Sequence, residues 1–470
     1  MTKTRIEKDL LGEKEINAEI YYGIQTKRAM ENFPITGYKP HPELIRALAF
    51  VKKSATEANM QVKRLNSKIG QAICQACDEI IAGQLHQYFV VDVIQGGAGT
   101  SMNMNANEVI ANRAIELLGG DKGDYSIVSP NTHVNMAQST NDAFPTAINI
   151  ATLKLAEKTL ASLNLLRDAL KEKEVEFDEV LKMGRTHLQD AVPIRLGQEF
   201  SAYVAVISRD LRRIKNSLED LKEINMGATA VGTGLNADPD YIKIVADRLR
   251  ANSGIDFITA GNLVDSTQNT DAFVAVSAAL KICAVNLSKM ANDLRLLSSG
   301  PKCGFNEINL PPVQPGSSIM PGKVNPVMAE VVNQVAFQIM GNDHTICLAS
   351  EAGQLELNVM EPVLTFNLLQ SLDILRNVVK VFAEKCIKGI TVNKQRCIEL
   401  VEGSIGIVTA INPHVGYETA SIVAKEALRT GKPIREIVLE KGILTEEELD
   451  KILNPYDMTR PGISGVELLK

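Results

Sequence analysis

Two long segments with apolar residues at alternating steps of four and three constrain the fold of this chain most strongly. Within residues 197–225 these positions are Phe200, Val204, Ile207, Leu211, Ile214, Leu218 and Leu221. Residues 271–298 repeat the pattern from Phe273 to Leu297. Such spacing gathers the apolar side chains on one helical face and forms the seam of packed helices. The second segment is apolar beyond one stripe, which predicts that it is buried nearly all round.

The composition agrees with a helical protein. Hydrophobic residues make up 45% of the 470 residues, yet aromatic residues reach only 4% and Trp is absent. A core built from aliphatic residues and Ala favours close-packed helices over a β-sandwich. Two further helices are expected near residues 327–350 and 358–387. Helices of about 30 residues run ~45 Å, longer than one ordinary subunit can cover, so we expect a bundle shared between subunits.

The length predicts two or three domains. We expect a mainly α-helical protein of three domains: a mixed, mainly helical N-terminal domain (1–140), a central helical bundle (141–390) and a small helical C-terminal domain (391–470). Residues 5–16 are expected to be irregular, with a short helix at best. Helices are predicted at 43–59, at 68–82 and from about Asn107, and Thr445 with Glu448 predicts a capping box in the tail.

Charge and targeting signals exclude several classes of protein. The net charge of −6 argues against a nucleic-acid binder. The charged N-terminus lacks an apolar signal core, and no apolar run is expected to reach the length of a bilayer span, so we predict a cytoplasmic protein without membrane contact. Seven scattered cysteines indicate reduced thiols. Cys74 and Cys77 form a CxxC inside a predicted helix, where core thiols are favoured over a zinc site, and the six histidines lie too far apart in sequence to predict a metal site.

Three polar stretches interrupt the helical segments: residues 96–105 with 138–146, then 183–193, then 315–326. The glycine-rich start of the first does not have the spacing of a dinucleotide-binding fingerprint. It is expected to deliver Thr100, and the residues before the next long helix supply Ser139, Thr140 and Asn141. The second stretch carries Thr186 and His187 in an unusually polar turn; a lone histidine there would be an ordinary helix-end residue.

The third stretch reads PGSSIMPGKVNP from residue 315 to 326. Gly and Pro at this density cannot extend a helix or a central strand. Small polar residues between them leave backbone N–H groups free to point at a ligand. The pattern of a nucleotide phosphate loop is missing, and a plain surface loop between two helices is the alternative reading.

Five segments in this order, GGAGTSMNMNANE, QSTNDAFPT, GRTHLQDAVP, GATAVGTGLNADP and GSSIMPGKVNP, resemble motifs of the fumarase/aspartase superfamily. The resemblance covers nearly the whole chain. The opening YYGIQTKRAMENFPITGY is similar to the aspartase branch, because fumarases usually carry Trp-Gly where Tyr22 and Gly23 stand. The resemblance implies reversible release of ammonia from L-aspartate to give fumarate, by proton abstraction at Cβ through an enediolate. A fumarase, an ammonia-lyase for a substituted aspartate and an inactive scaffold protein are the alternatives.

The resemblance also implies the roles of the candidate residues. Catalytic roles fall on Ser317 as the base, on His187 and on Lys323. The donors to the substrate's β-carboxylate would be Thr100, Ser139, Thr140 and Ser318. The groups near its amino group would be Asn141, Thr186 and His187. The partners of its α-carboxylate would be Lys323 and Asn325. Glu330 is expected to orient His187.

The assembly implied by the resemblance is a homotetramer in which each active site combines the polar stretches of three subunits. The substrate pair is L-aspartate and fumarate. We expect no cofactor and no bound metal, with a divalent cation as an alternative activator because some members of the superfamily respond to one.

Overall fold

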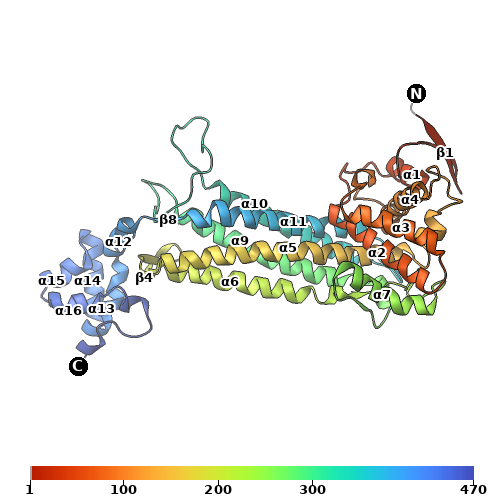
Figure 1. The fold of residues 1–470 in the computed structure, drawn as a ribbon. Helices are drawn as coiled ribbons and strands as arrows, with labels where there is room; N and C mark the ends of the chain where they lie inside the picture. Colours follow the sequence, from red (N-terminus) through yellow and green to blue (C-terminus); the bar gives the residue numbers. More distant parts are fainter. Residues whose placement is uncertain (1–2, 470) are drawn as a thin grey trace. The chain divides into compact units, whose positions relative to one another are not determined.

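The computed structural model describes residues 3–469, and helices dominate it as the sequence predicts (Figure 1). The helices are α1 (Ile24–Asn32), α2 (Pro42–Gln61), α3 (Ser67–Ile81), α4 (Thr100–Leu117), α5 (Thr140–Glu176), α6 (Leu196–Ser217), α7 (Pro239–Ser253), α8 (Asp265–Gln268), α9 (Asp271–Leu297), α10 (Val327–Glu351), α11 (Glu361–Lys385), α12 (Lys394–Glu402), α13 (Val408–Val415), α14 (Tyr417–Thr430), α15 (Ile434–Glu440) and α16 (Glu446–Ile452). The strands are β1 (Thr4–Asp9), β2 (Gly12–Asn17), β3 (Leu181–Thr186), β4 (Gln189–Arg195), β5 (Glu223–Ile224), β6 (Ile258–Thr259), β7 (Ile308–Asn309) and β8 (Thr391–Val392).

The strands pair two by two, and only β5 with β6 is parallel among the described pairs. The chain divides into two compact units, each built from separate stretches. Unit 1 takes residues 3–161, 212–284 and 336–376; unit 2 takes 162–211, 285–335 and 377–469. The long helices α5, α6, α9, α10 and α11 contribute residues to both units. The predicted domain limits at 140/141 and 390/391 stay a prediction.

The apolar seams lie where the sequence predicts them. Phe200, Ile207 and Ile214 of α6 are fully buried, as are Val276 and Leu280 of α9. Helix α6 ends at Ser217, earlier than expected, and Leu221 is buried in the 3₁₀ turn that follows. The predicted helices near 43–59 and 68–82 are confirmed as α2 and α3, and the capping box of α16 is present.

Helix α9 differs from its prediction in two respects. Ile282, Val285 and Leu296 are 40%, 49% and 41% exposed, so within one chain the helix is not buried all round. By length and composition this helix could also cross a membrane, which corrects the expectation that no apolar run is long enough. Half of its most apolar window is buried inside the chain, which is how core helices pass the same test.

Three segments have a different structure from the one that the sequence predicts. Residues 4–17 form the hairpin β1–β2; only Glu7 and Ile16 in it are buried, so the apolar alternation that predicts strands is missing. Helix α4 begins at Thr100 and not near Asn107, because buried interactions of its asparagines override their weak helix propensity. Residues 183–193 belong to the hairpin β3–β4.

Candidate functional site

The first residues of α4 and α5 meet in unit 1. Gly99 precedes α4 at φ +86°, and a Cβ there would lie 2.4 Å from the ring of Phe144 in α5. Thr140 accepts a hydrogen bond from Asn103 Nδ2 at 3.1 Å, which joins the two helix starts again. The structure therefore brings Thr100 close to the Ser139–Asn141 segment. Two helix N-termini at one place favour a bound carboxylate.

Local capping fixes the start of α5. The Ser139 hydroxyl accepts from Asn141 N at 3.2 Å, and Ser139 N donates to Asp142 Oδ1 at 2.9 Å, a reciprocal arrangement like a capping box. Pro145 has no N–H, so it cannot bond the carbonyl of Asn141 four residues earlier. Asn225 Nδ2 donates to that carbonyl at 2.9 Å instead, and Asn141 Nδ2 donates to Ala230 O at 2.7 Å.

Two buried ionisable residues lie beneath this loop and were not predicted from the sequence. Asp142 is fully buried and accepts from Gly227 N and Thr229 N, each at 3.1 Å. Lys52 of α2 is fully buried and donates to Asn135 Oδ1 and Gln138 Oε1, both at 2.9 Å. Lys52 stands within the apolar stripe of α2, four residues after Leu48, and a charge at such a position was the available signal.

Burial perturbs both groups. Desolvation raises the pKa of Asp142 to about 6, although the backbone N–H donors and the charge of Lys52 act in the opposite direction. Desolvation lowers the pKa of Lys52 to about 7, against the attraction of Asp142. Strong pKa shifts of this kind cluster at functional sites. Here they lie under the loop that carries Ser139, Thr140 and Asn141.

His187 occupies the tip of the β3–β4 hairpin in unit 2. Thr186 pairs with Gln189, which leaves His187 and Leu188 as a two-residue turn with φ of +55° and +61°. Positive φ at both positions defines a type I′ turn, usually made by Asn or Gly. Without glycine the conformation costs on the order of 1 kcal/mol per residue and persists at functional sites. The side chain of His187 is exposed.

Ser317 lies in a loop closed at its neck. Gly316 N donates to Lys323 O at 2.8 Å, and Asn325 Nδ2 donates to Gly316 O at 2.5 Å. A Cβ on Gly316 would lie 2.4 Å from Lys323 O, so this position requires glycine. The loop joins β7 to α10 and projects from the ribbon near α10 (Figure 1). Ile319, inside the segment closed by Gly316 and Lys323, is 82% exposed. Gly316 therefore holds the neck of the loop together.

The hydroxyl of Ser317 faces backbone donors. Ile319 N and Met320 N lie 3.2 and 3.0 Å from Ser317 Oγ and donate to it. Ser317 and Lys323 line the same hollow of about 460 Å³, while Ser318 is exposed. Donors aimed at an oxygen stabilise its anion, which is what a serine needs to act as a base.

The candidate residues fall into two groups. Thr100, Ser139, Thr140 and Asn141 belong to unit 1, whereas the hairpin, the Ser317 loop and Glu330 belong to unit 2. Glu330 is in the first turn of α10, and no hydrogen bond joins it to His187 within residues 3–469. No group of three potential metal-ligating side chains occurs in the described part of the chain.

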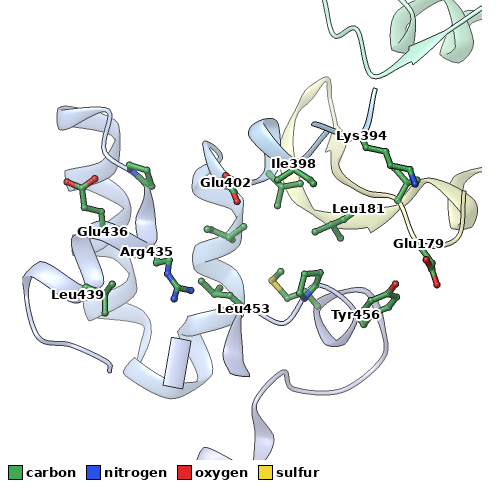
Figure 2. A pocket seen from close by; sticks show the side chains of 16 residues that line it. Glu179, Leu181, Lys394, Ile398, Glu402, Arg435, Glu436, Leu439, Leu453 and Tyr456 are labelled. Carbon is green, nitrogen blue, oxygen red and sulfur yellow. The ribbon is translucent and has the colours of Figure 1, made fainter. Parts of the chain in front are cut away.

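A separate cavity of about 770 Å³ lies among the C-terminal elements of unit 2 (Figure 2). Leu181, Ile398, Leu439, Leu453 and Tyr456 contribute to its mainly apolar wall. It contains none of the predicted site residues, so volume alone does not mark the site here.

Two protein families match this chain, and curated relatives match it over nearly its whole length. The family described as Lyase matches residues 12–341, and the family described as Fumarase C C-terminus matches residues 407–460. Aspartate ammonia-lyase of Bacillus subtilis is 65% identical over 466 residues, 99% of this chain and 98% of the relative. Aspartate ammonia-lyase of Helicobacter pylori is 52% identical over 459 residues, covering 97% of this chain and 98% of the relative.

Solved structures agree with the fold. A fumarate lyase:delta crystallin from Brucella melitensis, bound to cobalt, superposes with a TM-score of 0.95 at 49% identity and covers 98% of this chain and 100% of its own. The recombinant class II fumarase of Schistosoma mansoni has a TM-score of 0.93 at 38% identity, with coverage of 98% and 100%.

Proposed function

Because the chain belongs to the lyase family that includes these aspartate ammonia-lyases and the class II fumarase, we propose how its residues carry out the family's elimination chemistry. The chain is an ammonia-lyase that converts L-aspartate to fumarate and ammonia in a reversible, non-oxidative reaction. The observation that carries the mechanism is the hydroxyl of Ser317, held by two backbone N–H donors in a loop that also offers Lys323.

The base acts first. Ser317 Oγ, as the alkoxide stabilised by Ile319 N and Met320 N, takes the proton from Cβ of L-aspartate. The electron pair of the broken C–H bond moves into the β-carboxylate, which becomes a dianionic enediolate. That pair then returns to form the Cα–Cβ double bond as the C–N bond breaks and ammonia leaves. Fixed donors around the enediolate lower the barrier most, since they match charge that develops only in the transition state.

The helix starts of unit 1 suit that carboxylate. Thr100, Ser139 and Thr140, with Ser318 from the base loop, are small neutral donors for the developing charge. We assign the α-carboxylate to Lys323 and Asn325, and the amino group to Asn141, Thr186 and His187, with Glu330 orienting the histidine. In this structure Asn325 donates within the neck of its own loop, so binding by Asn325 requires the loop to change conformation.

We therefore propose that the Ser317 loop closes over the substrate. Ile319, Met320 and Val324 are 82%, 49% and 52% exposed, and closure would bury these apolar side chains. A closed site also keeps water from the enediolate. Hydrogen exchange across residues 315–326, with and without an unreactive dicarboxylate, tests this. Equal protection in the two states would leave Ser317 as a preformed base.

We propose a homotetramer whose active sites combine residues of three subunits. The supporting observation is exposed apolar surface on long helices of the single chain: Ile282, Val285 and Leu296 on α9, and Phe337 and Leu348 on α10 at 62% and 56%. Helices with such faces are normally covered. Sedimentation decides the point, and a stable, active monomer would refute it.

The remaining assignments are a cytoplasmic location, no membrane or nucleic-acid partner, and no cofactor, with activation by a divalent cation as the alternative. Within residues 3–469, α9 is the one helix that is both long and apolar enough to span a membrane, and half of its most apolar window is buried within the chain. Turnover after exhaustive chelation, compared with turnover after adding Mg²⁺, separates the two views of the cation.

The function itself is tested by following fumarate formation from L-aspartate and from L-malate. We expect fumarate from L-aspartate only. Fumarate from L-malate alone would identify a fumarase, activity with substituted aspartates alone would identify a relative of altered specificity, and no product from any of them would indicate an inactive scaffold.

A further inference from the structure

A buried carboxylate, Glu307, joins the two loops that carry the catalytic groups of unit 2. Its side chain is 0% exposed, and it immediately precedes β7, ten residues before Ser317. Both Glu307 oxygens lie within hydrogen-bond distance of Arg185 Nη1, at 2.9 and 3.0 Å. Arg185 stands on β3, two residues before His187. One ion pair therefore links the His187 hairpin, close to its turn, to the segment that enters the Ser317 loop.

Other contacts make this junction rigid. The guanidinium of Arg185 lies 4.1 Å from the ring centroid of Phe305, and Lys182 Nζ lies 3.5 Å from Glu307 Oε2. Lys182 is itself buried and reaches Glu199 Oε2 at 3.2 Å, so that oxygen has an ion-pair partner although it accepts no hydrogen bond. A buried charge set of this kind holds its geometry strictly, because leaving any member unpaired is costly.

The C-terminal helices reach the same junction. Asn393, which precedes α12, donates from its backbone N to Glu307 O at 2.9 Å and from Nδ2 to Asn306 O at 2.9 Å. Strand β8, just before Asn393, pairs with β7. The residues before the Ser317 loop are thus held on one side by β3 and on the other by β8 and α12.

We propose that Glu307 is a positioning residue that sets the His187 hairpin and the Ser317 loop against a common anchor through Arg185. Glu307 contacts none of the candidate substrate-binding residues. It acts by holding the hairpin at Arg185 and the segment that leads into the Ser317 loop in fixed positions. Misplacing catalytic groups by about 1 Å costs on the order of 10²-fold in rate. The kinetic part of this inference rests on the proposed ammonia-lyase reaction.

The variants are Glu307→Gln, Arg185→Gln and the double variant. Glu79→Gln is the control, because Glu79 accepts from Arg113 Nε and Nη2 at 2.6 and 2.9 Å in unit 1 and contacts none of the candidate loops. Kinetics are measured per folded chain, and hydrogen exchange is measured on the full protein without substrate.

We expect Glu307→Gln to lower kcat about 10- to 100-fold and to raise KM for L-aspartate several-fold. A smaller folded fraction alone would leave KM unchanged. Exchange should accelerate in residues 181–195 and 310–326, and the control should match the wild type in both segments. The double variant should lose no more activity than Glu307→Gln, because both changes break one link.

Unchanged exchange in both loops, or losses that add in the double variant, would overturn the proposal. If Glu307→Gln does not fold, exchange in Arg185→Gln decides the question by the same criterion. A wild-type protein without activity on L-aspartate would refute the proposed function instead, and the exchange experiment would still decide the role of Glu307.

Discussion

Replacing Lys52 with Met should change how stability depends on pH. The Lys52 side chain is fully buried among Asn135, Gln138 and Asp142. Burial lowers its pKa from 10.5 to about 7, whereas in the unfolded chain it keeps the ordinary value. Between these two values the unfolded chain binds the proton and the native chain does not. The native state therefore gains stability as pH rises from 7 toward 10.5.

The size of the effect follows from the two pKa values. Within that window each pH unit adds ~1.4 kcal/mol to the free energy of unfolding. The first unit above pH 7 adds less, because Lys52 is only partly deprotonated there in the native state. From pH 7 to pH 9 the wild type should gain about 2 kcal/mol per chain relative to Lys52→Met. Asp142, whose raised pKa is about 6, has the opposite sign: its contribution falls as pH rises through its own window, which ends below pH 7.

Lys53 provides the matched control. It is the next residue on α2 and pairs with Asp78 at 2.6 Å. Partial burial opposes the change, but the hydrogen bond and charge of Asp78 raise the pKa of Lys53. Lys53→Met should therefore follow the wild type between pH 7 and pH 9. Urea unfolding midpoints of the three proteins at several pH values measure the difference, and parallel curves for wild type and Lys52→Met would refute the buried-amine argument.

Three further predictions concern the Ser317 loop. Ser317→Ala should reduce turnover by several orders of magnitude and Ser318→Ala by ~10²–10³, because the first removes the base and the second only one donor; equal mild losses in steady-state kinetics would mean that the base is another residue. Lys323→Arg should not restore normal kcat/KM, because a planar fork cannot replace a compact ammonium in a small site, and near-normal activity would assign Lys323 a long-range field only. Gly316→Ala should open the neck of the loop and speed amide exchange in the loop. Gly322→Ala, with nothing within 4 Å of its added Cβ, should only add about 1 kcal/mol of backbone strain at φ +81°. Equal exchange in both variants would contradict the role of Gly316 in closing the neck.

Patterns along the sequence predict the helical class and the polar stretches that carry the candidate residues. Apolar steps of four and three identify α6 and α9, because a helix presents every third or fourth residue on one face. The density of Gly and Pro around Ser317 predicts a loop, and the ordered motifs predict the family that the comparisons identify. These signals are local, so they can be read along the chain.

Other features depend on contacts between residues far apart in sequence. Helix α4 begins at Thr100 because its buried asparagines find partners such as Asn135 and Thr140. The turn at His187 has positive φ, and Arg185, two residues before it, pairs with Glu307, which is 122 residues away in sequence.

Which charges are buried also depends on the tertiary structure. Glu307 looks like an ordinary surface residue in the sequence, and the position of Lys52 in an apolar stripe indicates burial without identifying its partners. Only their neighbours in space give Lys52 a pKa of about 7 and make Glu307 an anchor for two loops. Desolvation and pairing depend on what surrounds a side chain in space. Periodicity records which face a residue occupies, but the identity of the group that meets it there is fixed only when the chain folds.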